Sequence, residues 1–142
     1  MFIAAVLILA ACEVTPNDGT GDSRENAIHL FEGTFKDGDV VKDSEQWFSF
    51  SVTSGGTYYI HVIFGTLEYM NIRVFNRTGS PVGGKVDLWW DDVDWYFSRE
   101  LPGSGTYYIW VQPGMRPGWP YYSSDSGTYR IAFNKTAIPP TR

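Results

Sequence analysis

Three segments of this chain are nearly identical: GTYYI at residues 56–60, GTYYI at residues 105–109 and GTYRI at residues 127–131. Each begins with a glycine that follows a Gly- or Ser-containing turn, and each opens a run in which apolar side chains alternate with others. Because successive side chains of a strand point to opposite faces, this alternation predicts β-strands that leave tight turns. Three copies in 142 residues predict an antiparallel β-sandwich.

The alternation also predicts which side chains form the core. In the segment of residues 47–52, Phe48, Phe50 and Val52 share one face, and Ser49 and Ser51 share the other. The same reasoning places these further residues inside: Tyr58, Ile60, Val62, Met70, Ile72, Val74, Tyr107, Ile109, Val111, Tyr129, Ile131 and Phe133. The apolar residues left to form a second layer are Ile28, Leu30, Phe35, Val40, Val41, Leu88, Phe97 and Leu101.

No segment has sustained helical periodicity, and turn residues recur along the chain. We therefore expect an all-β fold: an antiparallel two-sheet β-sandwich, jelly-roll-like, with seven to eight strands in a single domain.

A looser duplication accompanies the repeated segments. Asp43 and Trp47 precede the first GTYYI as Asp91 and Trp95 precede the second, but the second copy has one extra residue after its tryptophan. Two related hairpins are the simplest interpretation. Because the side-chain period of a strand is two, the extra residue must be absorbed by a turn or a bulge. It is therefore open which of residues 96 and 97 points inward.

The N-terminal segment indicates export. Residues 2–11 are all apolar, which is the length of a signal-peptide core and too short to span a bilayer. The sequence LAAC at residues 9–12 resembles the bacterial lipobox. This resemblance implies a lipoprotein signal peptide over residues 1–11 and a lipidated Cys12 that holds the protein at a membrane of the bacterial cell envelope, on its periplasmic or surface face. An ordinary signal peptide that contains a cysteine is the alternative.

The segments that flank the predicted sandwich are polar. Residues 12–25 have almost no apolar side chains, so we expect a flexible tether there. The folded domain is expected over residues 26–135. Residues 136–142, which include two adjacent prolines, are expected to form a loose C-terminal tail.

The order of these motifs resembles that of the bacterial pre-peptidase C-terminal domain. An acidic residue, Trp47-Phe48, an alternating strand, a Gly-Gly turn, two GTYYI segments and a closing GTYRI follow one another over about residues 26–134. The resemblance implies a jelly-roll-like sandwich with an accessory role in binding, targeting or secretion, and some relatives bind calcium or polymeric substrates. Residues 87–95 depart from the family pattern because they are unusually rich in Trp and Asp, so no ligand role is carried over to them.

Aromatic residues near the last two strands form the first candidate site. The loop of residues 114–122 holds three aromatic rings and is stiffened by two prolines, and strand parity places another ring on the outward face of the adjoining strand. Exposed rigid rings stack well on sugars and peptides. The predicted ligand-binding residues are Trp110, Trp119, Tyr121 and Tyr122, with Trp89 or Trp95 as additional candidates. Alternatively, the rings pack over the edge of the sandwich as a lid.

Acidic turns form the second candidate site. Four carboxylates lie close together in the sequence at Asp87, Asp91, Asp92 and Asp94, and a second group lies at Asp37, Asp39 and Asp43. Closely spaced oxygen ligands suit calcium, so the first group is a candidate calcium site. A solvated acidic turn is the alternative, since neither group has the spacing of an EF-hand loop.

Composition narrows the function. The net charge is −5, with 16 acidic and 11 basic residues spread along the chain, which argues against a nucleic-acid partner. The two histidines lie on predicted strands, and the single cysteine is the predicted lipid site, so we expect no enzyme. The expected function is a non-catalytic, lipid-anchored envelope protein that binds or displays a protein or a surface polymer. Two alternatives remain: a carbohydrate-binding module around Trp119, and a structural surface lipoprotein with no small ligand.

Overall fold

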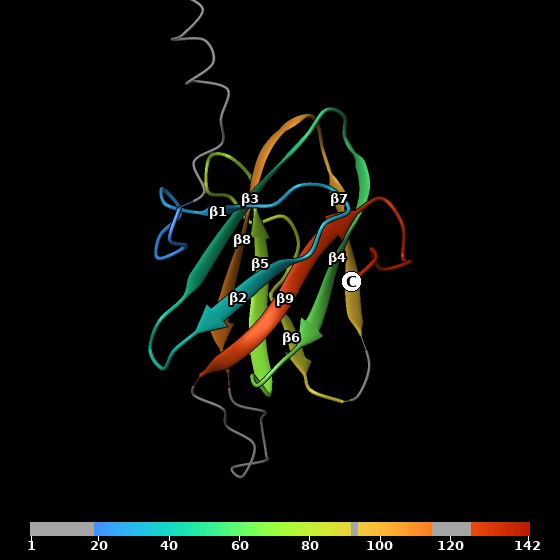
Figure 1. The fold of residues 1–142 in the computed structure, drawn as a ribbon. Helices are drawn as coiled ribbons and strands as arrows, with labels where there is room; N and C mark the ends of the chain where they lie inside the picture. Colours follow the sequence, from blue (N-terminus) through green and yellow to red (C-terminus); the bar gives the residue numbers. More distant parts are fainter. Residues whose placement is uncertain (1–18, 92–93, 115–125) are drawn as a thin grey trace, which may run out of the picture.

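The described part of the chain forms nine strands in two facing sheets (Figure 1). The computed structural model describes residues 19–91, 94–114 and 126–142. The strands are β1 (Ile28–His29), β2 (Lys36–Val40), β3 (Gln46–Val52), β4 (Gly56–Phe64), β5 (Tyr69–Phe75), β6 (Val86–Trp89), β7 (Trp95–Leu101), β8 (Gly105–Pro113) and β9 (Gly127–Asn134). Within these residues there is no helix, and so none long and apolar enough to cross a membrane. The prediction of an all-β, two-sheet sandwich is confirmed.

The strand order is that of a jelly roll. The five-stranded sheet has the order β1-β3-β8-β5-β6, and the four-stranded sheet has the order β2-β9-β4-β7. Four antiparallel pairs are nested, β2 with β9, β3 with β8, β4 with β7 and β5 with β6. In a jelly roll, these nested pairs form one long antiparallel ribbon, which folds over so that its eight strands are divided between two sheets. The short strand β1 is added to this roll and pairs in parallel with β3.

The two GTYYI segments begin β4 and β8, and the turn before each connects one sheet to the other. Neither segment is the second strand of a hairpin. β3 and β4 follow one another along the chain but lie in different sheets, and the same is true of β7 and β8. The first arch pairs with the second, β3 with β8 and β4 with β7. Gly56 and Gly105 begin the strands after these crossings with φ of 136° and 141°, a conformation that favours glycine, which explains the repeated residue. The interpretation as hairpins was wrong because alternation fixes the faces of a strand but not its partner.

The core agrees closely with the predicted parity. Every residue assigned inward from the five alternating segments is buried. In the second layer, Leu30, Phe35, Val40, Leu88 and Leu101 are buried, while Ile28 and Phe97 pack partly buried against the core. The register resolves the open choice in β7, where Phe97 lies opposite Ile60 and Tyr96 is 52% exposed. Val41 was wrongly assigned to the second layer and is 56% exposed, because it follows the last residue of β2.

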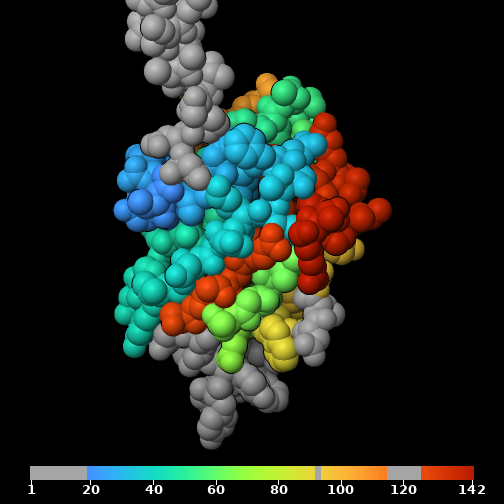
Figure 2. Space-filling model, viewed as in Figure 1, coloured from blue at the N-terminus to red at the C-terminus, as the bar shows by residue number. Residues whose placement is uncertain are grey.

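The C-terminal residues lie against the body of the domain (Figure 2). His61 is on the outward face of β4 by parity, yet it is only 1% exposed. Its Nε2 atom lies 2.8 Å from Asn134 Oδ1 and 3.1 Å from the Thr136 carbonyl oxygen. Arg142 forms an ion pair with Asp94 at 2.5 Å. The sequence predicts a loose tail over residues 136–142, whereas the structure gives it these fixed partners.

A glycine and a tyrosine fit together where β2 meets β9. Gly38 lies opposite Tyr129, and a Cβ atom on Gly38 would lie 2.3 Å from the Tyr129 ring. The Tyr129 hydroxyl donates a hydrogen bond of 2.6 Å to Gln46 Oε1, which also accepts the Asp39 backbone N–H at 2.9 Å. The absence of a side chain at Gly38 therefore lets the ring of Tyr129 reach its partner across the sandwich.

Substitution Gly38→Ala should lower the free energy of unfolding by about 1–3 kcal/mol, since the new methyl group overlaps the Tyr129 ring. Gly84→Ala is the matched control because a Cβ atom there meets no atom within 4 Å. Urea unfolding of both variants measures the difference. Equal effects of the two substitutions would contradict the close packing at Gly38.

Candidate functional site

Outward aromatic side chains lie on the central strands of the five-stranded sheet. Trp110 of β8 lies between Trp47 of β3 and Arg73 of β5 in the strand register, so the three residues form a row across the sheet. Their neighbours in the sequence, such as Ile109 and Val74, are fully buried, which confirms that the row faces away from the core. We call this outward surface the aromatic face.

A hollow of about 260 Å³ lies on the aromatic face and is lined by Trp47, Arg73, Phe75, Lys85 and Trp110. The rings of Trp47 and Phe75 have centroids 5.6 Å apart and are tilted by 42°. The indole N–H of Trp110 donates to Glu45 Oε2 at 2.5 Å. These contacts hold the rings in place while leaving them half-buried, so the hollow is organised without a ligand.

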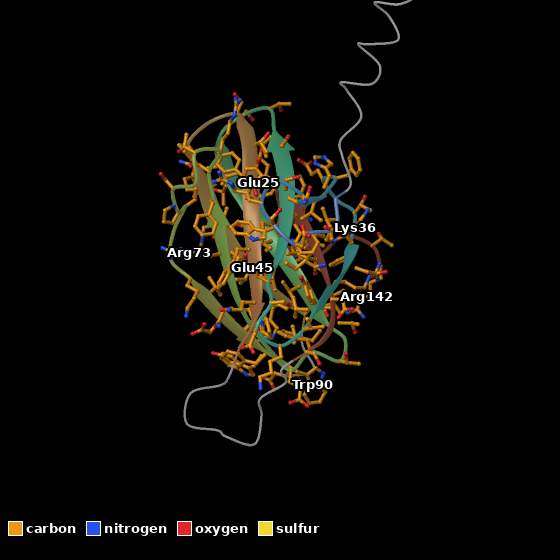
Figure 3. The ribbon with its side chains drawn as sticks, turned by 90° about the vertical axis from the view of Figure 1, so that its left-hand side faces the viewer. Glu25, Lys36, Glu45, Arg73, Trp90 and Arg142 are labelled. Carbon is orange, nitrogen blue, oxygen red and sulfur yellow. The ribbon has the colours of Figure 1, made fainter. Side chains whose placement is uncertain are left out.

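The aromatic face also carries positive charge. The Arg73 guanidinium carbon lies 5.7 Å from the Phe75 ring centroid, and Arg73 Nε is buried without a hydrogen-bond partner. In the described part of the chain, neither Arg73 nor Lys85 forms an ion pair. The Arg24 guanidinium carbon lies 5.5 Å from the ring centroid of Tyr108, which is the outward residue of β8 next to this row. Figure 3 shows Arg73 on the opposite side of the molecule from Lys36 of β2.

The predicted aromatic site is placed only in part. Trp110 is on an outward face, as its parity predicts. Trp119, Tyr121 and Tyr122 lie outside the described residues, so their part in a binding site stays a prediction. Trp89 and Trp95 do not line the hollow. Their rings pack together at 4.9 Å, and the indole N–H of Trp95 donates to the Trp89 carbonyl oxygen at 2.7 Å, which indicates a structural role.

Sequence reasoning did not select Trp47, Arg73, Phe75 and Lys85 as site residues. The first three are outward positions of alternating strands, which was a usable signal. What the sequence does not show is that β3, β8 and β5 are neighbours, since the pairing β3-β8-β5 joins residues that are far apart in the chain.

The predicted calcium ligands are dispersed where the structure describes them. Asp87 lies on β6 opposite Asn71, and Asp94 is paired with Arg142. Asp91 is exposed, and Asp92 lies outside the described residues. Within the described ranges, no three His, Cys, Asp or Glu side chains come close enough to hold a metal ion. A calcium site at this turn therefore stays a prediction without geometric support.

The two histidines are not part of the aromatic hollow. His61 is covered by the C-terminal residues, as described above. His29 Nδ1 lies 3.4 Å from Ser49 Oγ, and its ring contacts Phe31 edge-on at 4.7 Å. Neither histidine lines the hollow around Trp110, so no imidazole lies beside its aromatic rings.

A larger hollow, of about 500 Å³, lies at one end of the four-stranded sheet beside Tyr129. Its cation, Arg130, already forms an ion pair with Asp37 at 3.2 Å. Burial raises the pKa of the Tyr129 phenol well above its usual range, and the charge of Asp39 raises this pKa further. The internal pairing of charges makes this hollow a weaker candidate for a charged ligand than the aromatic face.

Taken together, the fold and the aromatic face define a jelly-roll β-sandwich domain with an open, partly cationic sheet surface. No protein-family model matches the sequence. No curated protein matches it either.

Several solved structures have a similar outline. They include the pre-peptidase C-terminal domain of collagenase from Bacillus anthracis, with 18% identity, a TM-score of 0.46 and coverage of 75% of this chain and 91% of that one. The Yersinia pseudotuberculosis-derived mitogen has 15% identity, a TM-score of 0.46 and coverage of 74% and 86%. Salmonella Typhimurium PliG, a periplasmic inhibitor of g-type lysozyme, has 16% identity, a TM-score of 0.44 and coverage of 75% and 96%. The first belongs to the family that the sequence motifs resemble, and identities this low give no information on function.

The buried phenol of Tyr129 leads to a prediction on pH. The unfolded phenol loses its proton near pH 10, whereas the folded one keeps it to higher pH, so the free energy of unfolding should fall as the pH rises above about 10. The fall is at most about 1.4 kcal/mol per pH unit for one group. Tyr129→Phe should reduce this slope, and Tyr59→Phe, on the outer face of β4, should retain it. Urea unfolding at pH 8 and pH 11 measures both, and an unchanged slope in Tyr129→Phe would contradict the assignment.

Proposed function

We propose that this protein is an exported, non-catalytic binding domain, and that it holds a surface polysaccharide on the aromatic face. The observation that carries the proposal is the preformed hollow in which Trp47, Phe75 and Trp110 stand half-buried on an otherwise regular sheet. Flat rings with solvent on one side stack on the C–H faces of sugars. A sheet surface also suits an extended polymer, because the ligand can run across several strands.

A binding role without catalysis is supported by the residues around the hollow. They supply aromatic rings and fixed positive charges, but no histidine and no pair of carboxylates placed to act as acid and base. The single cysteine, Cys12, directly follows the apolar leader and lies outside the hollow. The described residues that line the hollow therefore support binding and offer no acid–base pair for catalysis.

Export and anchoring rest on the leader. The apolar run of residues 2–11, which ends within LAAC at residues 9–12, supports cleavage before Cys12 and its lipidation. Two or more acyl chains on one residue hold a protein at a membrane, where a single chain is only marginal. The polar segment after Cys12 then connects the lipid to the sandwich and leaves the aromatic face free to meet a polymer.

The binding proposal predicts the effect of Trp110→Ala. Loss of the central ring should lower the affinity for a bound polysaccharide by about tenfold or more, since stacking on one aromatic ring contributes on the order of 1–2 kcal/mol. Tyr59→Ala, which removes a half-buried ring from the outer face of the four-stranded sheet, is the matched control. Affinity electrophoresis of the purified full chain in a panel of polysaccharides measures both. Retention unaffected by Trp110→Ala across the panel would contradict the proposal.

The anchoring proposal predicts the effect of Cys12→Ser. A hydroxyl group cannot replace the thiol in lipidation, so the variant should leave the membrane fraction and appear in the soluble exported fraction. Ser44→Ala, a substitution in the folded domain, controls for expression and handling. Fractionation with metabolic labelling by a radioactive fatty acid measures both. Continued membrane retention of Cys12→Ser would show that another feature holds the protein there.

A further inference from the structure

We infer that the polymer bound on the aromatic face is an acidic polysaccharide, whose carboxylates pair with Arg73 and Lys85 while its rings stack on Trp47 and Trp110. The inference rests on the proposed function and names the class of its ligand. Both cations line the same hollow as the two indoles. A sugar bearing a carboxylate therefore finds a stacking surface and a counter-charge within one site.

The two cations line one hollow, and no carboxylate is among the described residues that line it. Lys85 directly precedes β6, and Arg73 directly follows Ile72, which is the residue that pairs with Val86. Like charges opposite one another on neighbouring strands destabilise a sheet. An anionic ligand that reaches both side chains reduces this repulsion.

Three other arginines of the described chain have polar partners within the domain. Arg130 pairs with Asp37, and Arg142 pairs with Asp94. Arg99 donates to the carbonyl oxygens of Gly84 and Ser98 at 2.7 and 2.8 Å. Within the described residues Arg73 has no ion pair, and its guanidinium lies over the face of the Phe75 ring. Because Arg73 also lines the aromatic hollow, its guanidinium is placed to bind an external anion there.

Two carboxylates on this face do not line the hollow. Glu45 accepts the indole N–H of Trp110 and keeps its negative charge beside that ring. Asp87 lies opposite Asn71, two residue pairs from Arg73 and on the same outward face. The described residues that line the hollow thus include two cations and no carboxylate, in a chain with a net charge of −5. This separation of charge favours an acidic ligand over a neutral one.

The spacing of Trp47 and Arg73 across the sheet suits an extended ligand. Trp47 and Arg73 are separated by one strand, β8, which corresponds to about 10 Å across the sheet. A guanidinium binds a carboxylate through two parallel N–H bonds, which fixes orientation as well as charge. A uronic-acid chain lying across the strands can therefore stack on an indole and place a carboxylate at Arg73.

The test compares two polymers that differ only in charge. The purified full chain is titrated with polygalacturonate and with the same polymer after chemical reduction of its carboxylates to alcohols. We expect affinity for the acidic polymer to be about tenfold higher, and this difference to shrink at high salt. In the double variant Arg73→Gln, Lys85→Gln, affinity for polygalacturonate should fall about tenfold, while affinity for the reduced polymer should stay unchanged.

Control variants separate this inference from the proposed function. Arg77→Gln removes one exposed positive charge from the turn after β5, away from the hollow, and should change affinity by less than about twofold. If Trp110→Ala weakens binding to both polymers while the double variant changes neither, the acidic ligand class is wrong and the aromatic binding face stands. If Trp110→Ala has no effect on binding, both are wrong. If the wild-type protein binds neither polymer, the acidic ligand class is wrong, and the polysaccharide panel decides the proposed function. Equal affinity for polyglutamate would show attraction to charge alone and would overturn the polysaccharide assignment.

Discussion

The pairing of β8 with β3 on one side and β5 on the other determines both faces of the five-stranded sheet. Ile109 lies between Phe48 and Val74, and all three are fully buried. One residue further along β8, the opposite parity places Trp110 between its two outward neighbours. A shift of one residue in either pairing would expose the buried row and bury the row of indoles. The core therefore fixes the register, and the register fixes the aromatic face.

Sequence reasoning recovered the features that depend on period two. The inward residues of β3, β4, β5, β8 and β9 were all assigned correctly, because one buried face per strand leaves a local signal. The partners of those strands were not recovered. Residues 47–60 read as a hairpin, but a jelly roll sends the two strands into different sheets. Connections that cross the sandwich and connections that stay in one sheet have similar turn residues, so the local sequence does not distinguish them.

His61 shows a second limit of parity. Alternation in β4 places this residue outward, and the structure agrees on its direction. Its burial comes from residues 134–136, which follow β9 and cover that part of the four-stranded sheet. Burial of an outward residue depends on which segment crosses the sheet, and that is a tertiary property. The composition of residues 136–142 predicts a loose segment. Composition alone does not show that Thr136 can bind Asn134 or that Arg142 can pair with Asp94.

Net charge and local charge lead to different conclusions in this protein. The excess of acids argues against partners that need a broad basic surface, and that argument depends only on the count of charges. The aromatic hollow depends on placement, and there two cations remain without carboxylate partners while Arg130 and Arg142 are neutralised elsewhere. A small group of cations on an acidic domain acts at short range, within about a Debye length of the site. The net charge of the chain therefore says little about which ligand the aromatic face can bind, and the placement of Arg73 and Lys85 says more.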